Sequence, residues 1–414
     1  MKLILSHPTA NNFARAAAYR FEEEEMLYAF YTSIALFPGG IIGKLQKVSF
    51  LKDIQRRNFK PELKPYTKSS PWLEIGRMLS MKAGLKYLIR NEYGLFSVDS
   101  VYKNMDKYVA ADLNNAAKNG VNAVYAYEDG ALETFIEAKK LGLKCIYDLP
   151  IAYWETGKKL MDQEAERLPE WAATLGGGIL DSTTKLERKS RELELADLVV
   201  VPSPFVMDSL PEWAKKKKVV IAPFGTPVSN SEDVIIERNK DNKKPLRVLF
   251  AGSMSQRKGL GDLFAAVKLL NNTNIELVVM GKPQASMAFY KNEFHDFKYE
   301  HGRPNDEVLA LMRTCDVFCL PSIVEGRALV MQEAMSQGLP LIITPNTGGK
   351  DLVIEGKTGF MIPIRSPHVI AEKLNWFLEN RSEILEMGKS AKLHAQKYTW
   401  ENYGNLIVEA IKQL

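Results

Sequence analysis

The chain has 414 residues, a length typical of two domains, and its 46% hydrophobic and 25% charged residues are ordinary for a globular protein. The longest nearly apolar stretch, residues 33–43, is interrupted by Pro38 and is far shorter than the roughly 20 residues that a membrane-spanning helix needs. The three cysteines are odd in number and widely spaced, which argues against a disulfide framework. With an N-terminus that lacks the cleavage site of a signal peptide, this composition predicts a cytoplasmic protein.

The net charge of +5 is unevenly distributed along the chain. Residues 44–91 carry twelve Lys or Arg and three acids, 12 − 3 = +9, so the remainder carries 5 − 9 = −4. Blocks of apolar and basic residues of this kind are typical of a segment on an anionic membrane surface, and also of a solvated insertion. Nucleic-acid binding is disfavoured, because the segment has no recognisable module or platform of stacking aromatic residues.

Short apolar runs that alternate with amphipathic helical patterns predict parallel β-sheets covered by helices on both faces. In the first half the predicted strands are residues 2–6, 123–127, 144–147, 198–202 and 219–222. In the second half they are residues 247–251, 276–280, 297–300, 317–320 and 340–343. Helical patterns lie between them, for example at residues 130–141, 262–270 and 306–314.

A polar stretch of mixed charge, residues 229–245, is the predicted linker between two α/β halves. It predicts an N-terminal domain at residues 1–228, with the basic segment 44–91 as an insertion, and a second domain at residues 229–397. Two doubly wound domains that face each other enclose a cleft, and ligands bind outside the carboxyl ends of parallel strands.

One predicted helix of the second half begins after Gly326 and carries two glutamates, Glu325 and Glu333, that are eight residues apart. No Ser, Thr, Asp or Asn stands beside Gly326 as a cap, so the first N–H groups of the helix are available to a phosphate. At about 1.5 Å per residue, the two glutamates lie roughly 12 Å apart along the axis, which suits a nucleotide sugar bound across the helix start. The alternative interpretation is a pair of surface glutamates on a good helix former.

Two further loops follow predicted strands of the same domain. The loop after residues 247–251 carries Arg257 and Lys258, whose charges suit a departing diphosphate. The turn after residues 340–343 carries Gly348 and Gly349, which permit close approach of the backbone to a ligand. Each loop alone is equally well explained as an ordinary solvated connection, but their combination with the two glutamates favours a nucleotide-sugar site.

Over residues 245–400, these motifs together resemble the retaining glycosyltransferases of family 4, which have the GT-B fold. The motifs that carry the resemblance are Glu325-x7-Glu333, the loop Arg257-Lys258-Gly259, the pair Gly348-Gly349 and the stretch Thr358-Gly359-Phe360. The resemblance implies an α/β protein with two Rossmann-like doubly wound domains that face a cleft. It also implies that residues 398–414 form a terminal helix that crosses back to the N-terminal domain, anchored by Trp400 and Tyr403.

By position, the resemblance implies that Glu325 holds the hydroxyls of the donor sugar, Glu333 holds the ribose, and Arg257 and Lys258 bind the diphosphate. The other residues expected to bind the donor are Gly252, Ser253, Gly302, Arg303, Gly326, Arg327, Ala328, Leu329 and Val330, the last three through backbone N–H groups. The sequence departs from the family at Ser253, where members often have Arg, and at Arg327-Ala328, where they usually have Phe-Gly. We therefore expect Arg327 to reshape the donor pocket.

The N-terminal half matches the family less closely, and its candidates concern the acceptor side. Asp148 follows a predicted strand at the position where members often have His or Asp beside the reacting sugar, so it is the first candidate there for a catalytic role. The further acceptor-side candidates are His7, Asn11, Asn12, Glu128 and Asp129. The alternative for the carboxylates is a helix N-cap, and for His7 a structural role.

The resemblance implies front-face transfer, with retention, from a nucleotide sugar such as a UDP-sugar to a glycan or lipid-linked acceptor, as in the synthesis of cell-surface polysaccharides or glycoconjugates. The sequence has no Asp-x-Asp pair and no cluster with zinc spacing, so we expect neither a metal nor another cofactor. A lipid-linked acceptor at the inner membrane face would explain the basic segment. Two alternatives stay open, namely a nucleotide-sugar epimerase on the same fold and a non-catalytic nucleotide-sugar-binding subunit.

Overall fold

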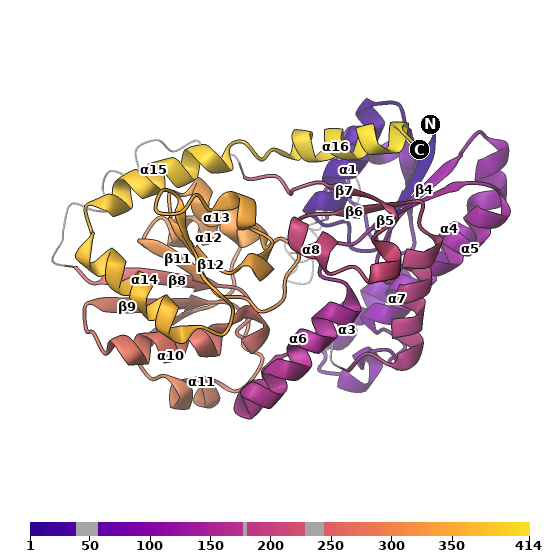
Figure 1. The fold of residues 1–414 in the computed structure, drawn as a ribbon. Helices are drawn as coiled ribbons and strands as arrows, with labels where there is room; N and C mark the ends of the chain where they lie inside the picture. Colours follow the sequence, from indigo (N-terminus) through magenta and orange to yellow (C-terminus); the bar gives the residue numbers. More distant parts are fainter. Residues whose placement is uncertain (39–56, 177–179, 228–243) are drawn as a thin grey trace.

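The computed structural model describes residues 1–38, 57–176, 180–227 and 244–414, which form two parallel sheets side by side (Figure 1). Most of the predicted linker, and residues 44–56 of the basic segment, lie outside the described residues. No helix in the described ranges is long and apolar enough to cross a membrane.

The N-terminal sheet has seven parallel strands in the order β3-β2-β1-β4-β5-β6-β7. They are β1 (Leu3–Ser6), β2 (Leu27–Thr32), β3 (Thr67–Ser69), β4 (Ala123–Tyr127), β5 (Lys144–Asp148), β6 (Leu198–Val201) and β7 (Lys218–Ile221). Its helices are α1 (Asn12–Glu23), α3 (Trp72–Lys82), α4 (Val98–Lys118), α5 (Leu132–Lys140), α6 (Trp154–Arg167), α7 (Thr183–Leu195) and α8 (Pro204–Asp208). Successive residues of a strand face opposite sides, so Leu3 and Leu5 pack in one core with α1, whereas Ile4 packs in another with α4 and α5.

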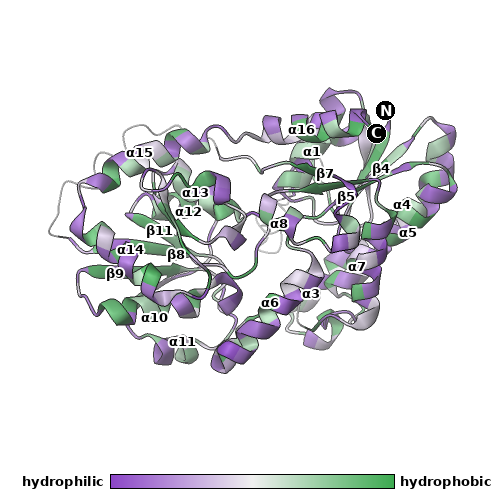
Figure 2. Ribbon diagram, in the orientation of Figure 1, coloured by the Kyte–Doolittle hydropathy of each residue, from purple (hydrophilic) through white to green (hydrophobic). Residues whose placement is uncertain are grey.

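The C-terminal sheet has six parallel strands in the order β10-β9-β8-β11-β12-β13. They are β8 (Leu246–Ala251), β9 (Ile275–Met280), β10 (Phe297–Glu300), β11 (Val317–Leu320), β12 (Leu341–Ile343) and β13 (Gly359–Met361). The helices are α10 (Leu260–Leu270), α11 (Met287–Glu293), α12 (Asn305–Met312), α13 (Leu329–Ser336), α14 (Pro367–Glu379) and α15 (Glu383–Ala395). Figure 2 shows hydrophobic strands enclosed by helices whose outward faces are hydrophilic.

The α/β class with two doubly wound parallel sheets is confirmed, and each of the ten predicted strands is present. Three strands were not predicted. β2 is buried along most of its length and does not alternate between apolar and polar residues, β3 is a three-residue polar edge strand, and β13 begins at Gly359, whose φ of 150° is unusual for a strand.

The two domains exchange elements. The last helix, α16 (Trp400–Lys412), leaves the second domain and packs on α1, with Tyr403 and Ile407 in the N-terminal core (Figure 1). In the opposite direction, α6 leads into the 3-10 helix η4 (Pro169–Thr174), whose Trp171 is buried in the core of the second domain. Trp171 of the first half of the chain thus completes the core of the second domain.

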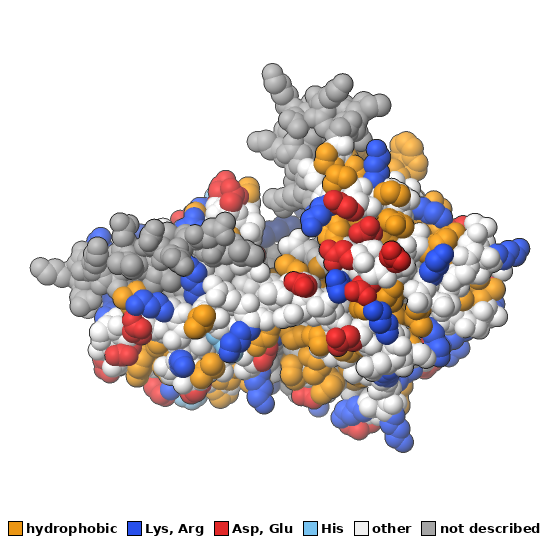
Figure 3. Space-filling view, turned by 90° about the horizontal axis from the view of Figure 1, so that it is seen from above, with side chains coloured by type: hydrophobic (Ala, Val, Ile, Leu, Met, Phe, Trp, Pro, Cys, Tyr) orange, Lys and Arg blue, Asp and Glu red, His pale blue; other side chains and the backbone are white. Residues whose placement is uncertain are grey.

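The outer face above α1 and α16 carries interleaved acidic and basic side chains (Figure 3). Glu24 follows α1, and its carboxylate contacts Arg20 at 2.5 Å and Lys412 at 2.6 Å. The pair with Lys412 ties the end of α16 to the end of α1.

Candidate functional site

A cleft of about 580 Å³ lies between the domains, at the carboxyl ends of strands from both sheets. All of the predicted donor-side residues line it: Gly252, Ser253, Arg257, Lys258, Gly302, Arg303, Glu325, Gly326, Arg327, Ala328, Leu329, Val330 and Glu333. The N-terminal domain contributes Phe13, Pro150, Ile151 and Phe224 to the wall. The basic loop and the helix with the two glutamates therefore come together at one site, whereas Gly348 and Gly349 are not among its lining residues, and Gly348 packs against Gly326 instead.

Glu325 is held by two cations. One of its carboxylate oxygens, Oε1, lies 2.5 Å from Nη1 of Arg257 and 2.5 Å from Nζ of Lys258. Burial acts to raise the pKa of Glu325, but the charges of Lys258 and Arg257 outweigh it and hold the pKa below its ordinary value. Glu325 is therefore a fixed carboxylate that can accept hydrogen bonds.

Lys258 ends the short 3-10 helix η7 (Gln256–Lys258) that follows β8. Burial lowers the pKa of Lys258, and the charge of Arg257 adds to this, whereas Glu325 opposes it. Arg257 also donates to the Val324 carbonyl at 3.0 Å, which fixes its guanidinium at the edge of the cleft. Two cations and one carboxylate side by side on the cleft wall leave an excess of positive charge for an anionic ligand.

Helix α13 begins beside these cations. Its N-cap residue is Ala328, which makes no side-chain capping bond, and the first N–H groups of a helix have no partner within it. The Ala328 N–H itself donates to the Thr347 carbonyl at 3.2 Å, which corrects its expected role as a ligand donor. The N–H groups of Leu329 and Val330 remain the helix-start donors that the sequence predicts.

Arg327 does not reach the donor space with its side chain, contrary to expectation. Its guanidinium is fully buried, donates to Asp351 at 2.7 Å and to the Gly348 carbonyl at 3.1 Å, and lies over the Tyr398 ring. The guanidinium also donates a hydrogen bond to the side-chain oxygen of Gln332. The amide nitrogen of Gln332 in turn donates to the carbonyl of Phe224, in the segment between the domains. Arg327 therefore stabilises the turn at Gly348 through a hydrogen bond to its backbone.

Gly326 is one of the points where the second domain contacts the first. Its carbonyl accepts a hydrogen bond of 2.7 Å from the Ser203 hydroxyl, and a Cβ on Gly326 would lie 1.8 Å from the Pro150 carbonyl oxygen. Gly348 has a φ of +72°, in the left-handed region, and a Cβ on Gly348 would lie 1.8 Å from the Gly326 carbonyl oxygen. Only glycine fits this contact, which explains its presence after Glu325.

At the other end of the cleft, Glu333 accepts a hydrogen bond of 2.7 Å from the Asn305 amide. Burial raises the pKa of Glu333 above its ordinary value. Arg303, nearby on the wall, is paired with Glu300, and a Cβ at Gly302 would meet no atom within 4 Å. This end of the cleft is open enough to receive a flat ring.

A second cavity of about 380 Å³ adjoins the cleft, and Ile151, Ser253 and Arg257 line both. Glu128 and Lys189 form part of its wall, 3.4 Å apart. Burial raises the pKa of Glu128, as does Asp129, whereas Lys189 acts to lower it. Polar groups of both signs in a space beside the cleft suit a ligand that is rich in hydroxyl groups.

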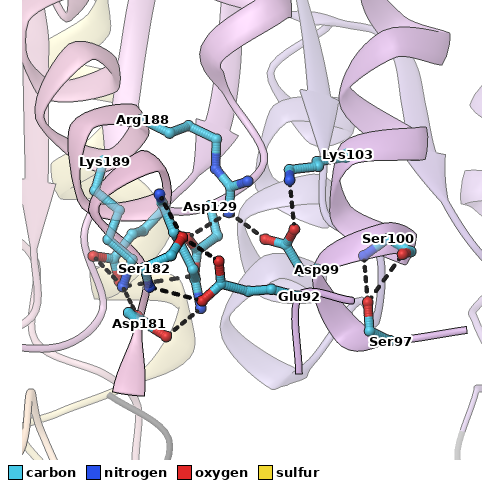
Figure 4. A network of polar contacts seen from close by, with 12 residues as sticks. Glu92, Ser97, Asp99, Ser100, Lys103, Asp129, Asp181, Ser182, Arg188 and Lys189 are labelled. Carbon is cyan, nitrogen blue, oxygen red and sulfur yellow. Dashed lines mark hydrogen bonds and ion pairs between the residues drawn. The ribbon is translucent and has the colours of Figure 1, made fainter. Parts of the chain in front are cut away.

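The loop that carries Glu128 and Asp129 is anchored by residues that the sequence did not single out. Glu192 of α7 accepts the N–H groups of Asp129 at 2.9 Å and of Ala131 at 3.1 Å. Arg188 binds the Asp129 carboxylate at 3.0 Å (Figure 4). On a charged amphipathic helix such residues look like a solvated face, so only the fold reveals them.

Asp148 is not among the residues that line the cleft or the adjoining cavity. It is fully enclosed, and its carboxylate accepts hydrogen bonds from Tyr125 at 2.5 Å and from Tyr403 of α16 at 3.4 Å. Burial raises the pKa of Asp148 to about 7. At the end of β5, the Asp148 side chain faces the core beneath α16. This corrects the expected position of Asp148 beside the reacting sugar.

The residues of the first loop have structural roles. The His7 ring accepts the N–H groups of Thr9 at 3.1 Å and Ala10 at 2.9 Å, and burial lowers its pKa to about 3. Asn11 caps α1 by accepting the Ala14 N–H. Asn12 lines a separate groove beside Trp400. His7 therefore has the structural role that the sequence analysis gave as its alternative. Asn11 and Asn12 do not line the cleft.

Among the residues that the structure describes, no group of three or more His, Cys, Asp or Glu side chains is placed to hold a metal ion. The expected absence of a metal and of other cofactors remains a prediction.

Comparison with known proteins points to one family for the second half of the chain. Residues 231–411 match the family model described as Glycosyl transferases group 1. The chain is 32% identical over 180 residues to a D-inositol 3-phosphate glycosyltransferase of Corynebacterium urealyticum, a match that covers 44% of this chain and 38% of that one. It is 29% identical over 237 residues to a lipopolysaccharide 1,2-N-acetylglucosaminetransferase of Salmonella typhimurium, covering 52% and 61%. The matches thus span less than two thirds of these relatives.

Solved structures resemble the whole chain. A sucrose-phosphate synthase from Thermosynechococcus elongatus has a TM-score of 0.66 at 16% identity and covers 100% of this chain and 98% of its own. Anabaena Alr3699/HepE, solved in complex with UDP-glucose, has a TM-score of 0.58 at 15% identity and covers 100% of both chains. These likenesses confirm the predicted GT-B fold.

Proposed function

We propose that the chain is a glycosyltransferase that moves a sugar from a nucleotide sugar to an acceptor hydroxyl. The observation that carries the proposal is the Glu325 carboxylate, fixed by Arg257 and Lys258 beside the uncapped start of α13. A carboxylate for sugar hydroxyls, two cations and free helix N–H groups for a diphosphate are the parts that such a donor requires. The family match of residues 231–411 supports the same activity.

The donor in this proposal is a UDP-sugar. Glu333 would accept the ribose hydroxyls at the open end of the cleft, where Gly302 and Arg303 would lie near the base. The complexes of Alr3699/HepE with UDP and UDP-glucose support this choice of nucleotide through a shared fold.

The transfer would proceed with retention by front-face attack. The bond between the sugar carbon and the diphosphate breaks, the acceptor oxygen bonds to that carbon from the same face, and the acceptor proton passes to the departing diphosphate oxygen. The protein then has to position both substrates and stabilise the developing negative charge, a task that suits Arg257 and Lys258. No metal is needed in this scheme.

The acceptor would occupy the cavity lined by Glu128 and Lys189. Its position against Ser253 and Arg257 favours transfer over epimerisation, because an epimerase needs no second substrate beside the sugar. The position of this cavity equally favours a transferase over a non-catalytic binding subunit. The proposal places the enzyme in the synthesis of a cell-surface polysaccharide or glycoconjugate with a glycan or lipid-linked acceptor, and the name of the Salmonella relative supports that setting.

A thermal-shift panel of UDP-, GDP- and ADP-sugars tests the donor, because a ligand that binds only the folded state raises the melting temperature. We expect a rise with a UDP-sugar, followed by release of UDP when an acceptor is added. A rise with none of them would refute the proposal. Release of free sugar and UDP at equal rates with and without any acceptor would favour the epimerase.

A further inference from the structure

The N-terminal domain exposes large apolar side chains along one continuous segment, residues 72–98, which we call the α3 surface. It comprises α3, the 3-10 helix η3 (Lys86–Ile89) and the start of α4. The most exposed are Trp72 at 78%, Tyr93 at 76% and Tyr87 at 70%. Further exposed members are Leu79, Met81, Leu85, Leu95 and Val98. Single exposed apolar residues are common on any protein, whereas a group of this density marks an interaction surface.

The α3 surface is a folded unit. Gly76 of α3 packs so tightly on the Phe96 ring that a Cβ there would lie 2.4 Å from it. The Phe96 N–H donates to the Leu88 carbonyl at 2.8 Å, and the Gly94 N–H donates to the Arg90 carbonyl at 2.8 Å. The exposed aromatic rings are therefore presented on a defined scaffold.

The charged residues of this segment differ in their exposure. Glu74 is buried and bound by Arg57 at 2.5 Å and Arg77 at 2.7 Å. In contrast, Lys86 and Arg90 are exposed, and the Arg90 guanidinium lies 5.4 Å from the centre of the Tyr93 ring. Exposed Trp and Tyr beside exposed cations is the composition of surfaces that insert shallowly among anionic lipid headgroups.

The α3 surface is joined to the cavity that adjoins the donor cleft. Glu92 accepts the Ser182 N–H at 2.9 Å, and the neighbouring Asp181 lines that cavity and contacts Lys189 at 3.5 Å (Figure 4). Leu180, one residue earlier, is 78% exposed and extends the apolar character toward the cavity. A molecule held in the headgroup layer beneath the α3 surface would thus be close to the acceptor side.

We propose that the α3 surface docks on an anionic phospholipid membrane and presents the adjoining cavity to an acceptor carried by that membrane. The membrane contact stands on the exposed residues alone, whereas the acceptor's route rests on the proposed function. The sequence analysis suggested a membrane contact for the basic segment, residues 44–91. The present proposal assigns this contact to aromatic and apolar side chains between Trp72 and Val98.

The test is sedimentation with phosphatidylcholine vesicles that do or do not contain phosphatidylglycerol, at low salt. The wild-type chain should sediment only with the anionic vesicles. The variant Trp72→Ser/Tyr87→Ser/Tyr93→Ser should bind them at least about tenfold more weakly, and Lys86→Glu/Arg90→Glu should lose the preference for anionic lipid. The matched control, Leu269→Ser/Leu393→Ser, removes two exposed apolar residues of the second domain and should bind as the wild type does.

Equal vesicle binding by the triple variant, or no binding by the wild type, would overturn the proposal. So would a dimer in size-exclusion chromatography that the triple variant dissociates, because the surface would then be occupied by a second copy of the chain. A retained melting-temperature rise with a UDP-sugar shows that each variant is folded. If a UDP-sugar does not raise the melting temperature of the wild type, that result would instead count against the proposed function.

Discussion

The Lys258 ammonium and the Glu325 carboxylate are 2.5 Å apart and belong to loops that follow two neighbouring strands, β8 and β11. Each loop alone has an ordinary interpretation. Their contact makes a charged unit that neither loop forms by itself.

Lys258→Ala and Glu325→Ala should each reduce the rate of transfer by about 100- to 1,000-fold, because in the proposed function each removes a group that acts on the sugar or on the departing diphosphate. The measurement is UDP release with donor and acceptor, alongside circular dichroism. Lys268→Ala, which removes an exposed lysine of α10, is the matched control and should retain the wild-type rate. Near-normal turnover in both cleft variants would remove these residues from the site.

Gly326→Ala should destabilise the protein by about 2 kcal/mol, because the new methyl group would collide with the Pro150 carbonyl, a backbone atom with little freedom to move. The free energy of unfolding in urea measures this. Gly302→Ala, in the same cleft, meets no atom within 4 Å and should leave that free energy within error of the wild type. If the two substitutions had equal effects, the close domain contact at Gly326 would be in doubt.

Arg327→Ala should cost about 2 kcal/mol of unfolding free energy, because it leaves the buried Gln332 amide oxygen and the Gly348 carbonyl without the hydrogen bonds that the guanidinium donates. The ratio of rates with different UDP-sugars should stay the same, since the guanidinium faces away from the donor space. Activity ratios measured beside urea denaturation separate the two effects. A changed donor preference at unchanged stability would restore the role that the sequence suggested.

Asp148 should make the protein less stable as the pH rises from about 4 to 7. Its pKa is raised from 3.8 to about 7 in the folded state, so the folded chain keeps a proton that the unfolded chain has lost over that range. The stabilisation is complete below the unfolded pKa and disappears as the pH passes the folded one. Asp148→Asn should remove this dependence, which amounts to at most about 4 kcal/mol.

Urea denaturation at several pH values between 4 and 8 measures the difference between Asp148→Asn and the wild type. Asp296→Asn, which changes an exposed carboxylate, serves as the control and should follow the wild-type curve. Parallel curves for all three proteins would mean that Asp148 is charged in the folded state throughout.

The sequence predicted the second domain in detail because its signals are local. Arg257, Glu325 and the glycine pair each stand directly after a buried strand, and parallel strands bring their carboxyl ends to one edge. The first domain was harder to predict. Asp148 also follows a strand, but whether its side chain faces the cleft depends on α16, which begins some 250 residues later and covers it with Tyr403.

The side chain of Arg327 illustrates another limit. Its position in the chain placed it correctly on the cleft wall, but its direction is decided by Asp351, Gln332 and Tyr398, whose arrangement no local pattern reveals. Lys189 and Glu192 were missed for the same reason, since a charged helix looks solvated until a neighbouring loop packs against it.

The exchange of elements between the domains has a consequence for biosynthesis. Because Tyr403, Ile407, Val408 and Ile411 complete the core around α1, the N-terminal domain cannot finish folding until α16 has been synthesised. The second domain, in turn, depends on Trp171 from the first half. Neither half should fold when expressed alone, and a premature stop before residue 400 should send the whole chain to proteolysis, although it would leave every residue of the cleft in place.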